Sequence, residues 1–166
     1  MKTAPVVLLM MGSETDLPTM KEAVNILEKF DIPYEMRISS AHRSPVRTMT
    51  LASEASGRGV KIIIAGAGMA AHLAGVVASK TILPVIGVPM PGGALNGVDA
   101  LYATVQMPGG IPVATMAIGK AGAKNAGLFA VQILALSDPQ YAEALLHYRV
   151  DMDKQLEQID AELQLC

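Results

Sequence analysis

Short apolar runs alternate with longer stretches of helical spacing along most of the chain. This alternation is typical of β-α units that wind a parallel sheet with helices on both faces. Each apolar run is nearly continuous, as strands covered on both faces are. The runs predict five parallel strands: Val6 to Met11, Tyr34 to Ser39, Lys61 to Ala65, Pro84 to Val88 and Ile111 to Thr115.

The segments between these runs carry helical spacing and predict helices at Leu17 to Phe30, Pro45 to Ser56, Ala70 to Lys80, Val98 to Gln106 and Ala123 to Leu136. Helices on both faces of one parallel sheet make three layers. The predicted fold class is therefore a three-layer α/β fold, flavodoxin- or Rossmann-like, with about five strands in its central sheet.

The pattern changes at Asp138-Pro139, which predicts the start of a long C-terminal helix over 138–164. Its apolar residues Met152, Leu156, Ile159 and Leu163 recur at intervals of four, three and four and form one narrow stripe. Such a stripe packs either on its own domain or on a neighbouring subunit, and both interpretations stay open. We expect a single domain, 1–166, with its α/β core over 1–136.

Composition narrows the possible functions. Apolar residues make up 51% of the chain and charged residues 17%, a balance that favours an oligomer. The net charge of −2, without a long run of Lys or Arg, argues against binding to nucleic acid. The run Val6 to Met11 is too short to span a membrane, and the N-terminus lacks a signal-peptide pattern. The single cysteine, Cys166, excludes an internal disulfide, so we expect a cytoplasmic protein.

The first two strands are followed by polar loops, at the sheet edge where parallel sheets bind ligands. In Met11-Gly12-Ser13-Glu14-Thr15-Asp16, Ser13 suits a phosphate and Asp16 a sugar hydroxyl, although either could simply cap the next helix. In Ser40-Ala41-His42-Arg43, the guanidinium suits a phosphate, Ser40 adds a hydroxyl donor, and His42 can exchange protons near neutral pH.

The third strand is followed by Gly66-Ala67-Gly68-Met69-Ala70-Ala71-His72, whose glycines let the backbone approach a ligand closely. We expect His72 in the first turn of the next helix, where it either lines a pocket or packs. Gly66, Gly68 and Ala71 match a dinucleotide fingerprint, but no Asp or Glu follows at the required distance. His147, on the terminal helix, is expected to be solvated.

Other chemistries lack their sequence signals. Gly119-Lys120 is not followed by Ser or Thr in a phosphate-loop frame, and no Gly-x-Ser-x-Gly elbow is present. No His, Asp and Glu cluster has metal-ligand spacing, so we predict no metal site. The chemistry that the sequence still supports is acid–base catalysis without a cofactor.

Taken together, the loops resemble the class I N5-carboxyaminoimidazole ribonucleotide mutase family, also called the phosphoribosylaminoimidazole carboxylase catalytic subunit or PurE family. The resemblance spans roughly Pro5 to Leu136, and the occurrence of its motifs in the right order makes it highly specific. The matching residues are Met11-Gly12-Ser13 with Asp16, Ser40-Ala41-His42-Arg43 with Pro45, Ala65-Gly66-Ala67-Gly68 with Ala70-Ala71-His72-Leu73, Gly97-Val98-Asp99, Val105-Gln106-Met107-Pro108, and Ala121-Gly122-Ala123 with Asn125-Ala126.

The resemblance implies a cofactor-independent isomerase of purine (IMP) biosynthesis that moves a carboxyl group from the exocyclic amine of the ribonucleotide to ring carbon C4. It implies CO₂ as a bound intermediate and assembly as a homo-octamer. His42 would transfer the protons, and Ser13, Asp16, Ser40 and Arg43 would hold the ribose phosphate. By the same resemblance the substrate-binding set also includes Gly12, Ala41, Gly68, Ala71, His72 and Leu73.

Two alternatives remain at this stage. The same fold could carboxylate aminoimidazole ribonucleotide directly, although Ala70-Ala71-His72 favours the mutase. A non-catalytic module that binds a sugar phosphate or a flavin would use Ser13 and Arg43 but would not need His42. The chain also departs from the usual family pattern at Met69, Ala74, Gly109 and Pro91-Gly92-Gly93.

Overall fold

The computed structural model describes residues 4–164, and the chain divides into two compact units, one up to Ala130 and one from Val131 onward. The first unit contains a five-stranded, all-parallel sheet in the order β2-β1-β3-β4-β5. Its strands are β1 (Val7–Met11), β2 (Tyr34–Ile38), β3 (Ile62–Ala67), β4 (Val85–Pro89) and β5 (Ala114–Thr115). The predicted α/β fold is confirmed, and the strand order is the flavodoxin-like one.

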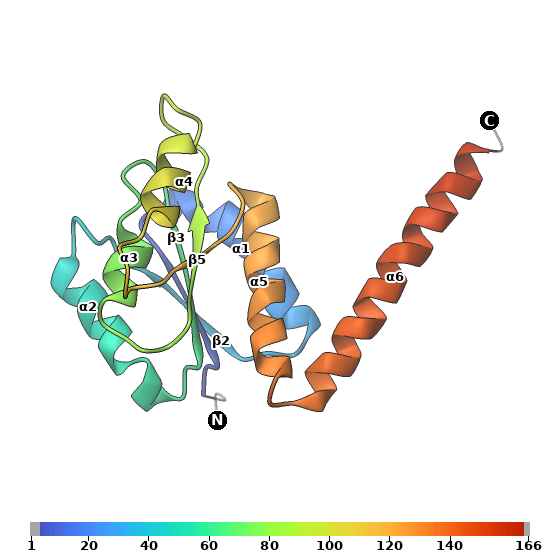
Figure 1. Cartoon of the computed structure of the whole chain (residues 1–166), viewed down its shortest axis with the longest axis horizontal. Coiled ribbons are helices and arrows are strands. Elements are labelled where there is room, and N and C mark those ends of the chain that lie inside the picture. Colours follow the sequence, from blue (N-terminus) through green and yellow to red (C-terminus); the bar gives the residue numbers. More distant parts are fainter. Residues whose placement is uncertain (1–3, 165–166) are drawn as a thin grey trace. The chain divides into compact units, whose positions relative to one another are not determined.

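The helices of the chain are α1 (Leu17–Lys29), α2 (Pro45–Glu54), α3 (Leu73–Ala78), α4 (Val98–Val105), α5 (Lys120–Ala135) and α6 (Pro139–Leu163). Two single turns lie at Glu14–Asp16 and Ser56–Arg58. In the first unit, α2 and α3 cover one face of the sheet, whereas α1 and the early turns of α5 cover the other (Figure 1).

The core follows from the two-residue period of the strands. Leu8 and Met10 of β1 and Ile63 of β3 pack in a cluster with α2 and α3, whose contributions include Ala52 and Val77. The alternate residues of the same strands point to the opposite face, and all of β1 is buried. The central strands therefore match the prediction of runs covered on both faces.

The edge strands differ from that prediction. β2 pairs only with β1, and Ile38 at its end is 47% exposed. β5 has two residues instead of the predicted five, since it pairs with β4 only through Ala114 and Thr115. Pro112 within the predicted strand lacks the N–H that a ladder requires.

Two helix starts also differ from the prediction. α3 begins at Leu73 rather than Ala70, because Met69 adopts a left-handed φ of 55° and a turn closes from the Ala71 N–H to the Gly68 carbonyl. α5 begins at Lys120, three residues earlier than predicted, directly after Gly119. The Gly119-Lys120 segment is thus the start of a helix.

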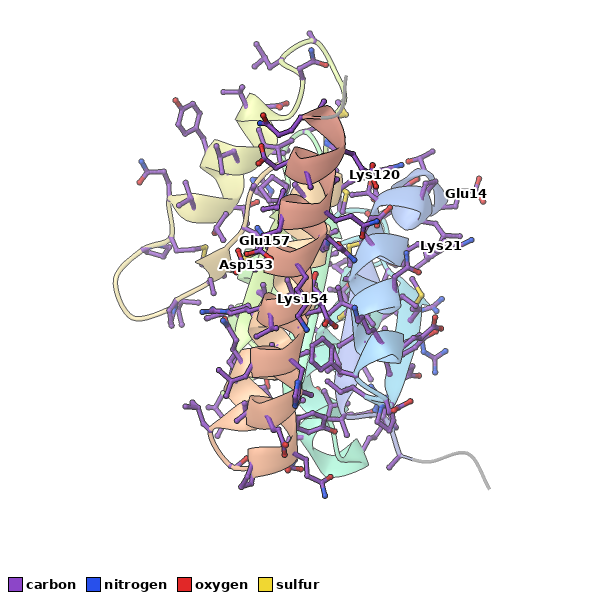
Figure 2. All side chains as sticks on the ribbon, turned by 90° about the vertical axis from the view of Figure 1, so that its right-hand side faces the viewer. Glu14, Lys21, Lys120, Asp153, Lys154 and Glu157 are labelled. Carbon is purple, nitrogen blue, oxygen red and sulfur yellow. The ribbon has the colours of Figure 1, made fainter. Side chains whose placement is uncertain are left out.

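The second unit contains the predicted C-terminal helix. Asp138 caps α6, and its carboxylate accepts the Gln140 N–H at 3.0 Å. The stripe Met152, Leu156, Ile159 and Leu163 is exposed. The same helix carries the charged residues Asp153, Lys154 and Glu157 (Figure 2). His147 is exposed, as predicted, and lies 3.8 Å from Glu143. Cys166 lies outside the described residues.

No helix within residues 4–164 is both long enough and apolar enough to cross a membrane.

Candidate active site

A cavity of about 560 Å³ opens at the carboxyl ends of β1 to β4. The loops that follow these strands converge there, as expected for an open parallel sheet. All the site residues predicted from the sequence line this cavity: Gly12, Ser13, Asp16, Ser40, Ala41, His42, Arg43, Gly68, Ala71, His72 and Leu73. The fold therefore brings together four loops that are widely separated in the sequence.

The loop after β1 is held by a reciprocal cap. The Ser13 hydroxyl accepts the Thr15 N–H at 3.3 Å, and the Asp16 carboxylate accepts the Ser13 N–H at 3.0 Å. The capping role considered for these residues is thus present. One carboxylate oxygen of Asp16 and the hydroxyl hydrogen of Ser13 are not used by the cap.

Burial raises the pKa of Asp16 above its ordinary value of 3.8. The Ser13 N–H and the positive charge of Arg43 act in the opposite direction but do not cancel the effect of burial. The carboxyl oxygen of Asp16 that the cap leaves unused can accept a hydrogen bond from a ligand hydroxyl.

The loop after β2 is tied to its neighbours by a chain of hydrogen bonds. The Arg43 N–H donates to the Ser40 hydroxyl at 3.2 Å, and the Arg43 guanidinium donates to the Gly12 carbonyl at 2.8 Å. Beneath the loop, the buried hydroxyls of Ser39 and Thr48 lie 2.8 Å apart. These contacts fix Arg43 at the edge of the cavity.

His42 meets His72 across the cavity rim. His42 Nε2 lies 2.8 Å from His72 Nδ1, and the rings form an edge-on pair with centroids 4.9 Å apart. In this contact one imidazole donates its N–H and the other accepts it. Both side chains are exposed, so a ligand in the cavity can reach a group that gives and takes protons.

His72 precedes α3 instead of lying in its first turn, which corrects the prediction for this residue. The left-handed backbone at Met69 delays the helix and leaves His72 at its N-terminal boundary. From this position His72 reaches the loop after β2, a contact that no sequence pattern indicated.

The loops after β3 and β4 line the rest of the cavity with small or apolar residues. With Ala67, the last residue of β3, they add Met69, Ala70, Met90, Pro91, Gly92 and Gly93 to the predicted set. Among the described residues that line the cavity, none comes from 97–99, 105–108 or 121–126. Those three matching segments therefore lie outside this cavity.

A second cavity, of about 430 Å³, adjoins the first and shares Gly12, Ser13, Ser40 and Arg43 with it. Sequence reasoning missed this cavity and its residues Ser44 and Arg47. Between residues 4 and 164, no group of three or more His, Cys, Asp or Glu side chains is placed to hold a metal ion.

Strand order and site together define a flavodoxin-like α/β protein with a small-molecule cavity at the carboxyl ends of its strands. Residues 6–155 match the family described as AIR carboxylase, and the chain belongs to this family.

Relatives agree with this assignment over nearly the whole chain. The N5-carboxyaminoimidazole ribonucleotide mutase of Pyrococcus horikoshii is 54% identical over 154 residues, which cover 93% of this chain and 86% of the relative. The protein of the same name from Synechocystis sp. is 54% identical over 161 residues, covering 97% and 90%. The crystal structure of Treponema denticola PurE matches with a TM-score of 0.85 at 28% identity, covering 96% of this chain and 98% of that one.

Proposed function

We propose that the chain is an N5-carboxyaminoimidazole ribonucleotide mutase. It would convert N5-carboxyaminoimidazole ribonucleotide to 4-carboxy-5-aminoimidazole ribonucleotide in de novo purine biosynthesis. The observation that carries the proposal is the His42–His72 pair at the rim of a cavity lined by small residues, in a chain 54% identical to curated mutases.

The reaction is an isomerisation and needs a single group that both gives and takes a proton. The bond between the exocyclic nitrogen and the carboxyl carbon breaks and releases CO₂, while protonated His42 gives its proton to that nitrogen. Ring carbon C4 then attacks the retained CO₂ and forms the new carbon–carbon bond. Neutral His42 removes the C4 proton, which restores the aromatic ring and the protonated imidazole. His72, at 2.8 Å, would orient the His42 ring.

The polar loops would hold the ribonucleotide. Arg43 and the hydroxyls of Ser13 and Ser40 suit the phosphate, and Asp16 suits a ribose hydroxyl. The backbone of Gly12 and Ala41 would lie against the same part of the ligand. Gly68, Ala71, His72 and Leu73 would enclose the imidazole ring, where small side chains leave room for the ring and for CO₂ and keep water out.

The proposal includes CO₂ as a bound intermediate, no cofactor, a homo-octamer and a cytoplasmic location. The exposed apolar stripe of α6 supports a role for this helix in subunit packing.

The test is turnover of N5-carboxyaminoimidazole ribonucleotide without ATP, followed by absorbance, in wild type and His42→Ala. We expect turnover to fall about 1,000-fold, the scale of lost general acid–base catalysis, while product binding measured by calorimetry changes little. His147→Ala, which alters an exposed histidine on α6, is the matched control and should keep wild-type turnover.

The outcomes separate the candidate functions. Wild-type activity only from aminoimidazole ribonucleotide plus bicarbonate would identify a direct carboxylase. Nucleotide binding without any turnover would identify a binding module, and full turnover by His42→Ala would reject His42 as the proton-transferring residue.

A further inference from the structure

The second cavity, of about 430 Å³, is called the outer cavity below, and the cavity of about 560 Å³ the inner one. The outer cavity is lined by Gly12, Ser13, Glu14, Ile38, Ser39, Ser40, Arg43, Ser44 and Arg47. Four of these residues also line the inner cavity, which contains His42. Because the two cavities share a boundary, a single ligand with two ends can occupy both.

Arg47 stands out among the lining residues. It is exposed, and no described residue forms a hydrogen bond or an ion pair with its guanidinium. It is the third residue of α2 (Pro45–Glu54), in the first turn, where the helix dipole disfavours a cation. Stability of the fold therefore gives no reason for an arginine at this position, whereas an anion bound in the cavity would.

The neighbouring groups also suit an anion. The hydroxyl oxygens of Ser13 and Ser40 accept backbone N–H groups, so their own hydrogens remain available to donate. Arg43 is held at the shared boundary by the Gly12 carbonyl. The only carboxylate among the residues that line the outer cavity is Glu14, which is exposed, so two guanidinium groups face one acidic group.

We propose that Arg47 is a specificity-determining residue that binds the phosphate of the ribonucleotide in the outer cavity, opposite Arg43. This inference rests on the proposed function for the identity of the nucleotide. With the phosphate between the two arginines, the ribose crosses the shared boundary and the imidazole ring reaches His42. Arg47 then selects a phosphorylated substrate over the corresponding nucleoside.

The test compares Arg47→Gln with wild type in binding and in turnover. Calorimetry measures the affinities for ribose 5-phosphate, aminoimidazole ribonucleotide and its dephosphorylated nucleoside. We expect Arg47→Gln to lower the affinity for both phosphorylated ligands about tenfold, which is the scale of one charge-assisted hydrogen bond. The affinity for the nucleoside should not change. KM should rise by the same factor, with kcat within about twofold, because the phosphate is remote from the reacting atoms.

Two further variants give the comparison its controls. Lys80→Gln makes the same charge change at an exposed position outside both cavities and should bind every ligand as wild type does. Arg47→Lys should recover part of the lost affinity, because an ammonium group keeps the charge but not the planar fork.

The proposal is overturned if wild type does not bind ribose 5-phosphate, or if Arg47→Gln binds it with wild-type affinity. It is also overturned if the substitution lowers the affinity for the nucleoside as much as the affinity for the nucleotide. Calorimetry with ribose 5-phosphate does not depend on turnover. An inactive wild type that still loses phosphate affinity in Arg47→Gln would reject the mutase function but keep the phosphate site.

Discussion

The two sides of the inner cavity are built in opposite ways. The loops after β1 and β2 carry the charged and hydroxyl groups and are cross-tied by hydrogen bonds such as that from the Arg43 guanidinium to the Gly12 carbonyl. The loops after β3 and β4 consist mainly of Gly, Ala, Met and Pro, with left-handed backbone at Met69, Gly92, Gly93 and Gly97.

This difference separates two tasks. A polar side that is fixed before a ligand arrives can orient charged groups without ordering them at the moment of binding. A side of small residues can instead approach a flat ring closely and exclude water. His72 is the exception, because it comes from the small-residue side and contacts His42 on the polar side.

The largest of the three predicted effects on stability concerns Gly97, in the loop after β4 but outside the part of that loop that lines the cavity. Gly97 has φ 88°, and a Cβ there would lie 2.9 Å from the Met90 carbonyl oxygen and 2.9 Å from Ile118. Gly97→Ala should therefore lower the free energy of unfolding by about 3 kcal/mol, through backbone strain and overlap together. Denaturant titration of wild type and Gly97→Ala measures this change in the free energy of unfolding.

Gly109→Ala is the matched control, since a Cβ at Gly109 meets nothing within 4 Å and its φ is not positive. Equal stability of the two variants would contradict close packing around Gly97 in the loop after β4.

A smaller loss of stability is expected on the polar side. Thr48 donates its hydroxyl hydrogen to the Ser44 carbonyl at 3.1 Å, so the buried Ser39 hydroxyl must be the donor in the 2.8 Å contact with Thr48. Thr48→Val keeps the shape but leaves the Ser39 hydroxyl without this acceptor. We expect a loss of about 2 kcal/mol in the free energy of unfolding.

Thr50→Val, an exposed change on the same helix, should stay within about 0.5 kcal/mol of wild type. If Thr48→Val changed the free energy of unfolding as little as Thr50→Val does, the Ser39–Thr48 hydroxyl pair would not stabilise the loop after β2.

The smallest effect concerns Asp16. Burial raises the pKa of this carboxyl above 3.8, so the folded protein binds its proton more tightly than the unfolded chain does. Stability contributed by this proton is present at low pH and is lost as pH rises from the unfolded pKa through the higher folded one. Asp16→Asn lacks the titration, so its stability relative to wild type should increase over that interval and stay constant above it.

Urea unfolding at a series of acidic pH values tests this prediction, with Asp153→Asn as the exposed control. If the stability of Asp16→Asn relative to wild type instead fell as pH rises, the pKa of Asp16 would be lowered in the folded protein and not raised.

Much of the fold could be predicted because the central strands are encoded locally. Val7–Met11 and Ile62–Ala67 are uninterrupted apolar runs, and the observed strands differ from the predicted ones by one or two residues. The prediction was poorer at the sheet edges and at α3. There the outcome depends on which strand pairs with which, and on one residue, Met69, whose left-handed backbone has no signature in the sequence.

The candidate site shows the same division. The order of the loops and their residue types indicated proton transfer and phosphate binding, because imidazole, guanidinium and hydroxyl groups keep their chemistry in any fold. Arg47 was not among the predicted site residues. An arginine in the first turn of a helix is unfavourable for the helix itself, and this was the signal in the sequence that could have identified it.

The sequence by itself determined the central apolar strands, the capped C-terminal helix and the polar loops that follow β1 and β2. Only the tertiary structure decided that His42 and His72, thirty residues apart, lie 2.8 Å from each other, and that Arg43 lies between two adjoining cavities. The physical reason is that apolar periodicity and side-chain chemistry are local properties. Distances between loops follow from strand order and register, which the chain fixes only when the whole sheet forms.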